Sequence, residues 1–142
     1  MSLLEFETGL AELLKEAKPE DIAIIRMYSV TNLSAICRLT TLLSERVPVP
    51  QERIFNYTPA SLLFHREELL PRLENPNLHY VVIDNIVYTG TTLESATNAL
   101  KRSGVAPENV WYLGYFRNSA DGIALDRARK IIVYASTRAI SA

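Results

Sequence analysis

The chain of 142 residues has little of what marks several classes of protein. It has one cysteine, Cys37, which excludes an internal disulfide and any cysteine-based metal site. A reducing compartment, the cytoplasm, is the simplest expectation for such a chain. No apolar run approaches the roughly 20 residues of a membrane-spanning helix, so we expect no membrane association. The acidic, amphipathic amino-terminal segment also differs from a secretory signal.

Neither sign of charge dominates the sequence. It has 15 Lys and Arg against 16 Asp and Glu, which gives a formal net charge of -1. No segment concentrates Lys and Arg, so the basic patch of a nucleic-acid-binding protein is missing, and we expect no nucleic-acid partner. A small phosphorylated ligand stays compatible with this balance, because backbone N–H groups bind anions without any net positive charge.

The composition is that of an ordinary globular protein, with 48% hydrophobic and 22% charged residues. The length fits one domain, which we expect to cover residues 1–142. We find no internal repeat, low-complexity stretch or linker. The sequence therefore predicts one folded unit with its own hydrophobic core.

The apolar residues of the first third predict a helix, a strand and a second helix. The first helix buries one stripe, and residues 22–25 form a continuous apolar run typical of a strand buried on both faces. Thr31 or Asn32 caps the second helix, which ends near Arg46 because prolines follow at 48 and 50. The expected inward residues are Leu3, Phe6, Leu10, Leu13, Leu14 and Ala17, then Leu33, Ile36, Cys37, Thr40 and Leu43.

The rest of the chain continues this alternation. Strands are predicted over 53–57, 79–83, 110–116 and 130–135, and helices over 61–73, 92–102 and 123–128. Ser103-Gly104 gives the helix over 92–102 its stop. Alternating strands and helices predict an α/β fold, a mainly parallel sheet flanked by helices on both faces. Ligands of such sheets bind beyond the carboxyl ends of the strands, where Thr31, Asp84 and Arg117 are expected.

The segment 80–93 has the residues for binding a phosphorylated sugar. Asp84 and Asn85 follow its apolar strand, and a predicted loop runs from there to Thr91. Tyr88, Thr89, Gly90, Thr91 and Thr92 lead into the next helix. Gly90 lets a ligand approach the backbone, and the unpaired N–H groups of a helix start favour an anion. Asp84 and Asn85 are placed to accept hydrogen bonds from sugar hydroxyls, and Asp84 to hold a hydrated Mg²⁺.

This segment, YVVIDNIVYTGTTL, resembles the phosphoribosyl-pyrophosphate (PRPP) loop of type I phosphoribosyltransferases. The resemblance implies that Asp84 and Asn85 contact the ribose hydroxyls and that residues 88–92 hold the 5′-phosphate of PRPP or a nucleoside monophosphate. It also implies Mg²⁺ as cofactor and a homodimer. The plainer alternative is a helix cap with a polar turn. The Rossmann and P-loop motifs do not fit, because the loop has one glycine and no lysine.

The sequence departs from the family pattern in three places. Asn85 replaces the second acidic residue, and Tyr88 stands where many purine-using members have Asp. The segment 26–32, where the family binds pyrophosphate, has no glycine. Its candidate pyrophosphate ligands are Arg26, Ser29 and Thr31, and the alternative is a strand end followed by a capping residue.

Further candidates come from the places where relatives build the rest of the site. Arg53 and Tyr57 stand where relatives have a mobile hood, and Arg117 where they contact the base or Mg²⁺. His79 and Trp111 are predicted to be structural. Three functions follow: a phosphoribosyltransferase acting on a nitrogenous base, a non-catalytic PRPP- or nucleotide-binding regulator, or an assembly subunit without ligand. The sequence does not identify the acceptor base.

Overall fold

The computed structural model describes residues 4–27, 33–57, 77–87, 98, 100–102, 104–117 and 131–133. The side chains of residues 4–5, 57, 85–87, 115–117, 131 and 133 lie outside this description. So do the predicted helices over 61–73 and 123–128. In the described part, no helix is long and apolar enough to cross a membrane.

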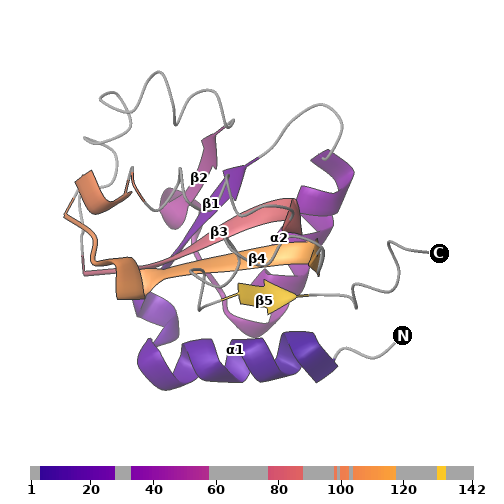
Figure 1. The fold of residues 1–142 in the computed structure, drawn as a ribbon, viewed down its shortest axis with the longest axis horizontal. Helices are drawn as coiled ribbons and strands as arrows, with labels where there is room; N and C mark the ends of the chain where they lie inside the picture. The colour runs from indigo at the N-terminus through magenta and orange to yellow at the C-terminus, as the bar shows by residue number, and fades with distance from the viewer. Residues whose placement is uncertain are drawn as a thin grey trace.

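Five strands form one sheet in the order β2-β1-β3-β4-β5 (Figure 1). All four neighbouring pairs are parallel. The strands are β1 (Ile22–Met27), β2 (Ile54–Tyr57), β3 (His79–Val87), β4 (Val110–Arg117) and β5 (Ile131–Val133). The predicted α/β fold with a parallel sheet is therefore confirmed.

The central strand β3 is longer than the sequence indicates. We expected it to end at Ile83 and a loop to begin at Asp84, but the ladder with β4 continues to the pair Val87 and Arg117. Asp84 and Asn85 therefore lie within β3. The prediction of a loop here was wrong because polar residues at a strand end do not reveal whether the neighbouring strand continues beside them.

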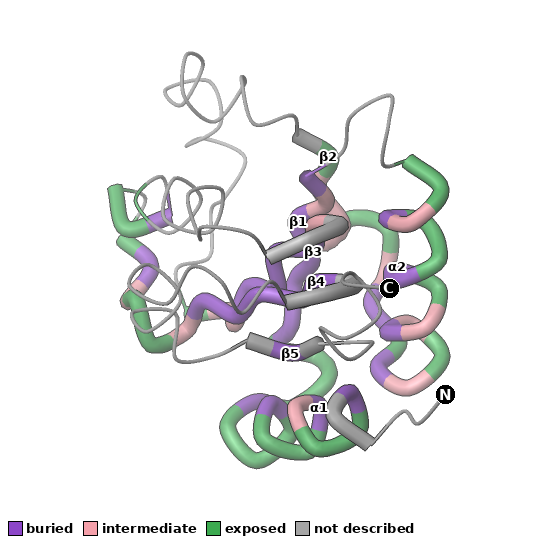
Figure 2. Tube along the Cα trace, turned by 45° about the vertical axis from the view of Figure 1, so that its right-hand side comes forward, coloured by how far each residue is buried: buried purple, intermediate pink, exposed green. Residues whose placement is uncertain are grey.

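Helices α1 (Leu4–Glu16) and α2 (Leu33–Arg46) cover one face of the sheet, which we call the first face. Figure 2 shows their buried sides turned toward the strands and their exposed sides turned outward. The buried residues of this layer are Phe6, Leu10, Leu13, Ala17, Ile22, Ile24, Ile36, Leu39, Leu43, Val47, Val49, Val81, Ile83, Trp111, Leu113 and Ile132. At about 25 cal/mol per Å² of apolar area, such burial is the main source of stability.

The opposite, second face packs against the helical residues that follow β3 and the turn after them. Residues 98 and 100–102 are helical, within the predicted helix over 92–102. The buried cluster on this face contains Ala23, Ile25, Met27, Tyr80, Val82, Leu100, Val105, Val110 and Tyr112. The sheet is thus covered on both faces, which explains the continuous apolar runs of its strands.

Three residues of the predicted helix stripes are exposed instead. Leu14 is 41% and Leu33 48% exposed, and Cys37 is also exposed. In α2 the inward positions are Ile36, Leu39, Thr40 and Leu43, a spacing of three, four and seven residues that leaves Cys37 outside the stripe. Leu33 is the first residue of α2, before the helix makes full contact with the sheet.

Two glycines have clear structural reasons. A β-carbon on Gly9 would lie 3.0 Å from both Cγ1 and Cγ2 of Ile132, so Gly9 lets α1 approach β5 closely. Gly104 has φ 95°, and its N–H donates to the Lys101 carbonyl while that of Val105 donates to the Leu100 carbonyl. This is a Schellman motif, and Leu100 and Val105 pack together in the second-face cluster. The predicted helix stop is confirmed.

The amino-terminal ends of three strands are built in the same way. A short 3₁₀ turn leads directly into each: η1 (Pro19–Asp21) into β1, η2 (Gln51–Arg53) into β2 and η4 (Pro107–Asn109) into β4. In each case the first strand residue donates its N–H to the first carbonyl of the turn. Proline begins η1 and η4, where its fixed φ suits a helical start.

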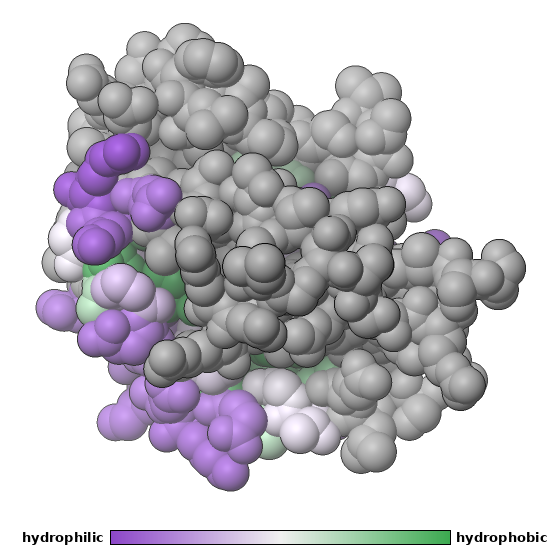
Figure 3. Space-filling view, in the orientation of Figure 1, coloured by the Kyte–Doolittle hydropathy of each residue, from purple (hydrophilic) through white to green (hydrophobic). Residues whose placement is uncertain are grey.

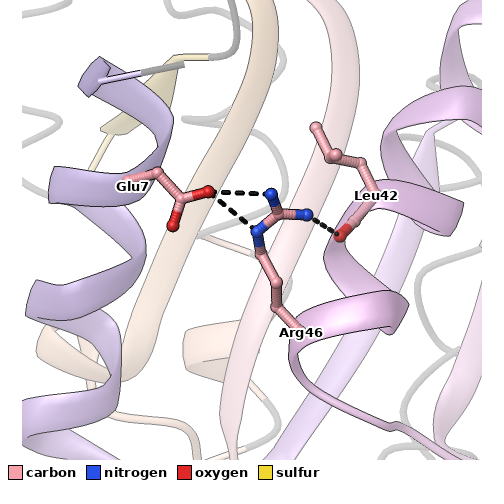
Figure 4. Close-up of polar contacts among 3 residues, drawn as sticks. All are labelled: Glu7, Leu42 and Arg46. Atoms are coloured by element: carbon pink, nitrogen blue, oxygen red, sulfur yellow. Dashed lines mark hydrogen bonds and ion pairs between the residues drawn. The ribbon is translucent and has the colours of Figure 1, made fainter.

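An arginine joins the two helices of the first face (Figure 4). Arg46 donates from Nε to Glu7 Oε1 at 2.9 Å, and its Nη2 lies 2.8 Å from the same oxygen. Its Nη1 donates to the Leu42 carbonyl, and the guanidinium lies 5.2 Å from the centre of the Phe6 ring. In Figure 3 the described hydrophilic residues lie along the left side of the molecule, from above mid-height to the bottom.

Candidate functional site

The strand order places the candidate site at the carboxyl ends of β1 and β3. From β1 the chain passes to β2 on one side and then to β3 on the other. The connections that leave β1 and β3 therefore diverge, and ligands of open α/β sheets bind in the crevice at this switch point. Arg26 pairs with Ile83 in the sheet, so Asp84 follows directly at the carboxyl end of β1. The topology thus brings a carboxylate to the expected place.

Asp84 is held by a tyrosine from the neighbouring strand. The Tyr112 hydroxyl donates to Asp84 Oδ2 at 2.8 Å. Tyr112 pairs with Val82, and Gly114 pairs with Asp84. The Tyr112 side chain therefore contacts the residue two positions beyond its own strand partner, on the same face of the sheet. Gly114 contributes no side chain beside the carboxylate. Tyr112 is 2% exposed, whereas Asp84 is half-buried at the end of the apolar second face.

The environment keeps Tyr112 protonated. Burial raises its pKa well above the usual value of 10.0, and the negative charge of Asp84 and the hydrogen bond to it raise the pKa further. The hydroxyl therefore remains a donor at neutral pH. Hydrogen bonds that involve a charged group are about twice as strong as neutral ones, so this contact fixes the carboxylate well.

Arg26 lies at the same edge but on the other face. Side chains alternate along a strand, and Ile22 and Ile24 belong to the first-face cluster, so Arg26 also leaves β1 on the first face. Its Nε donates to Asn56 Oδ1 at 2.6 Å. Asp84 follows Val82 on the second face. The structure does not bring Arg26 and Asp84 together, contrary to the expectation that one ligand contacts both.

Arg53 lies at the opposite end of the sheet. Its Nε donates to the Ile22 carbonyl at 3.0 Å and its Nη2 to the Pro19 carbonyl at 3.4 Å. Ile22 begins β1, so this guanidinium closes the amino-terminal end and is far from Asp84. The interpretation of Arg53 as part of a hood over the site was wrong. The strand predicted over 53–57 is present as β2, but Arg53 belongs to the turn that precedes it, at the end of the sheet away from Asp84.

Other site predictions fall on residues that the structure does not describe or describes by backbone alone. Ser29, Thr31 and the whole segment 88–92 lie outside the described residues. The backbone of Asn85 lies in β3, that of Tyr57 ends β2, and that of Arg117 ends β4 opposite Val87. These residues remain candidates for phosphate, pyrophosphate, ribose or base.

Sequence analysis missed Tyr112, although a signal for it exists. We interpreted the aromatic residues of 110–116 as packing residues because they have strand spacing. A buried tyrosine also needs a partner for its hydroxyl. The neighbouring strand ends in Asp84, and pairing the two predicted strands side by side suggests the contact. His79 and Trp111 are structural as predicted, because Trp111 Nε1 donates to His79 Nδ1 at 3.4 Å.

The described residues offer few ligands for a Mg²⁺ ion. Among the described ranges there is no group of three or more His, Cys, Asp or Glu that could hold a metal ion. Asp84 offers a single carboxylate at the site. Proteins often hold Mg²⁺ by one or two carboxylates together with substrate phosphates, so this donor set suits a metal that arrives with a phosphorylated ligand.

Comparison with known proteins gives one kind of match. No protein-family model matches the sequence, and no curated protein matches it. Among solved structures, orotate phosphoribosyltransferase from Aeropyrum pernix is similar, with a TM-score of 0.51 and 14% identity over 95% of this chain and 73% of that chain. At this identity the likeness concerns the fold alone. The chain therefore has an α/β fold with a parallel sheet similar to that of this orotate phosphoribosyltransferase.

Proposed function

We propose that this protein binds a ribose 5-phosphate group at the carboxyl ends of β1 and β3 and transfers phosphoribosyl from PRPP to a nitrogenous base. The observation that carries the proposal is the position of Asp84, held by Tyr112 beside the switch point. The segment Thr89-Gly90-Thr91-Thr92 follows on the same connection. The fold likeness to orotate phosphoribosyltransferase supports the same class of ligand.

Each part of the segment has a role in this proposal. Asp84 accepts hydrogen bonds from the vicinal ribose hydroxyls, and residues 88–92 hold the 5′-phosphate through N–H and hydroxyl groups. The bond from C1 to the pyrophosphate oxygen breaks, and its electron pair leaves with pyrophosphate. A ring nitrogen of the base forms the new bond to C1 with its lone pair and releases its proton to solvent. Catalysis then depends mainly on positioning and electrostatics.

Asp84 would hold Mg²⁺ together with the phosphates of PRPP. The metal would supply positive charge that offsets the charge building up on the departing pyrophosphate. Asp84 then serves two purposes, orienting the ribose and anchoring the metal next to it.

A second candidate function is binding of PRPP or a nucleotide without turnover. The position of Arg26 favours it. Arg26 is the basic residue of the segment 26–32, and it donates to Asn56 on the face of the sheet away from Asp84. Transfer requires that pyrophosphate be stabilised as it leaves, whereas binding of the ribose phosphate does not. The same site would then act as a sensor.

A turnover assay separates the two functions. The protein is incubated with PRPP, Mg²⁺ and a panel of purine and pyrimidine bases, and released pyrophosphate is measured. Base-dependent release that is lost in Asp84→Asn supports the transferase. Thermal stabilisation by PRPP without release supports the sensor, and a ligand at 100 times its Kd adds about 2.7 kcal/mol to the unfolding free energy. If PRPP causes no thermal stabilisation and no pyrophosphate is released, both proposed functions are overturned.

A further inference from the structure

The hydrogen bond between Tyr112 and Asp84 joins the buried core to the candidate site. Tyr112 belongs to the second-face cluster with Val82 and Val110, and it is 2% exposed. Asp84 is half-buried, two residues beyond Val82 on the same strand and face. The hydroxyl of Tyr112 is therefore a fixed point, and the carboxylate of Asp84 lies at the boundary between core and solvent.

We propose that Tyr112 is a positioning residue that sets the direction in which Asp84 meets the ribose hydroxyls. The inference rests on the proposed function and names the residue that gives the site its preference for a hydroxylated sugar. Tyr112 does not touch the ligand. It acts through Asp84 Oδ2, to which its hydroxyl donates at 2.8 Å.

Physical reasons favour a functional effect of this contact. An aspartate side chain has several staggered rotamers, and ordering one of them on binding costs free energy. A donor fixed in the core selects one rotamer before the ligand arrives. Gly114, the residue paired with Asp84, presents no side chain that would fix the carboxylate in its place. Tyr112 is therefore the residue of the neighbouring strand that contacts the carboxylate from the core.

The alternative is that Asp84 merely satisfies a buried hydroxyl. Buried tyrosine hydroxyls find acceptors in most proteins, and losing such a contact lowers stability. Stability alone therefore does not separate the two roles. Discrimination between a sugar with hydroxyls and one without does, because a purely structural contact leaves that ratio unchanged.

The experiment uses two phosphorylated rings that differ only in the vicinal hydroxyls. The probe with both hydroxyls is 1,4-anhydroribitol 5-phosphate, and the probe without them is tetrahydrofurfuryl phosphate. Kd is measured for each by calorimetry with the full chain, Tyr112→Phe and Tyr80→Phe. Tyr80 is a matched control, because it is 1% exposed on the same face, four residues before Asp84 on β3.

The wild-type protein should prefer the hydroxylated probe by about tenfold or more, since hydrogen bonds to a charged group discriminate at that level. In Tyr112→Phe the preference should fall to about threefold or less, with the Kd of tetrahydrofurfuryl phosphate nearly unchanged. Tyr80→Phe should keep the wild-type preference. Equal preference in Tyr112→Phe and the wild type would overturn the role of Tyr112 and leave the proposed function standing.

A second variant covers the case that Tyr112→Phe does not fold. Asp84→Glu keeps the charge at a half-buried edge position and moves the carboxylate away from the tyrosine hydroxyl. Its preference should also fall to about threefold or less. A wild-type preference in Asp84→Glu would mean that the direction of the carboxylate is unimportant, and the inference fails. If the wild-type protein binds neither probe, the proposed function and the inference are both overturned.

Discussion

The two ends of the sheet are built on different principles. At the amino-terminal end, β1, β2 and β4 each begin after a 3₁₀ turn with the same hydrogen bond, and Arg53 closes this end by donating to two main-chain carbonyls. At the carboxyl end, the described polar groups include a charged, half-buried carboxylate whose oxygen is bound by a tyrosine from the core.

Under the proposed function, this difference separates residues that stabilise the fold from a residue that binds ligand along the nine residues of β3. Its first residue, His79, accepts a hydrogen bond from Trp111 on the neighbouring strand β4. Asp84 adds a charge where burial is partial, and its desolvation costs free energy that the hydrogen bond from Tyr112 offsets. A charged group that is costly to bury is expected where a ligand binds. Asp84 is such a group, and it lies at the switch point.

The largest expected effect tests this division directly by removing one charge from each end. Asp84→Asn keeps the shape of the side chain and should weaken binding of a ribose 5-phosphate ligand about a hundredfold, because a charged acceptor is lost. Arg53→Met keeps the aliphatic stem and should leave Kd within about twofold while lowering the unfolding free energy by about 1 kcal/mol. Calorimetric titration and urea unfolding of both variants provide the two measurements.

The matched pair also shows how the comparison would break. If Arg53→Met weakened ligand binding as much as Asp84→Asn, the amino-terminal end would take part in the site and the division would be wrong. If Asp84→Asn instead lost several kcal/mol of stability with unchanged Kd, Asp84 would be structural. The fold would then place its ligand site elsewhere.

The next largest effect concerns the alkaline stability contributed by Tyr112. Burial, the charge of Asp84 and the hydrogen bond raise its pKa well above 10.0 in the folded protein. The folded state therefore keeps the Tyr112 proton that the unfolded chain releases near pH 10. The stabilisation of the folded state by the Tyr112 hydroxyl is present below pH 10 and is lost as the pH rises through the folded pKa. Above pH 10 this group lowers the unfolding free energy by about 1.4 kcal/mol per pH unit.

Urea unfolding of the wild type and Tyr112→Phe between pH 8 and pH 11 measures this effect. At pH 8 the wild type should be more stable by about 1 kcal/mol, and the difference should shrink toward zero near pH 11. The pKa of Tyr80 is also raised, by burial, so Tyr80→Phe should change in the same direction. A difference that stays constant from pH 8 to pH 11 would contradict the buried, protonated state of Tyr112.

Local pattern was enough to predict most of the described fold. The stripes of α1 and α2, the stop at Gly104 and the apolar runs of β1 and β3 follow from side-chain spacing and backbone chemistry, and the structure has all of them. The spacing of side chains along the sequence could not predict which strands and helices lie beside one another. The extension of β3 beyond Ile83 depends on β4 running alongside, and the exposure of Leu14 depends on how far α1 is covered by its neighbours.

The site was predictable at Asp84 and less so around it. An acidic residue after an apolar strand indicates the carboxyl edge of a parallel sheet, and Asp84 lies there. The faces of the sheet were not assigned from the sequence, so Arg26 was named as a pyrophosphate candidate for the same ligand as Asp84, although the two residues lie on opposite faces. Tyr112 was missed for the related reason that its partner lies on another strand, 28 residues away.

A smaller effect should follow from changing the turn that leads toward β4. Gly104 has φ 95°, a conformation in which a β-carbon is strained. Gly104→Ala should lower the unfolding free energy by about 1 kcal/mol. Ligand binding should stay unchanged, because this turn precedes the amino-terminal end of β4, away from the candidate site. Asn at the same position tolerates the conformation better, so Gly104→Asn should recover part of the loss in urea unfolding. Equal losses in both variants would argue against backbone strain as the cause.

The smallest effect belongs to the ion pair that joins α1 to α2, away from the candidate site. Glu7 is 47% and Arg46 30% exposed in their side chains. Glu7→Gln keeps an acceptor for Arg46 and removes the charge, so the unfolding free energy should fall by about 0.5 kcal/mol at low salt and by almost nothing at 1 M salt. Urea unfolding at two salt concentrations measures this. A loss that persists at 1 M salt would mean that the contact acts through packing of Arg46 on Phe6, since the guanidinium lies 5.2 Å from that ring.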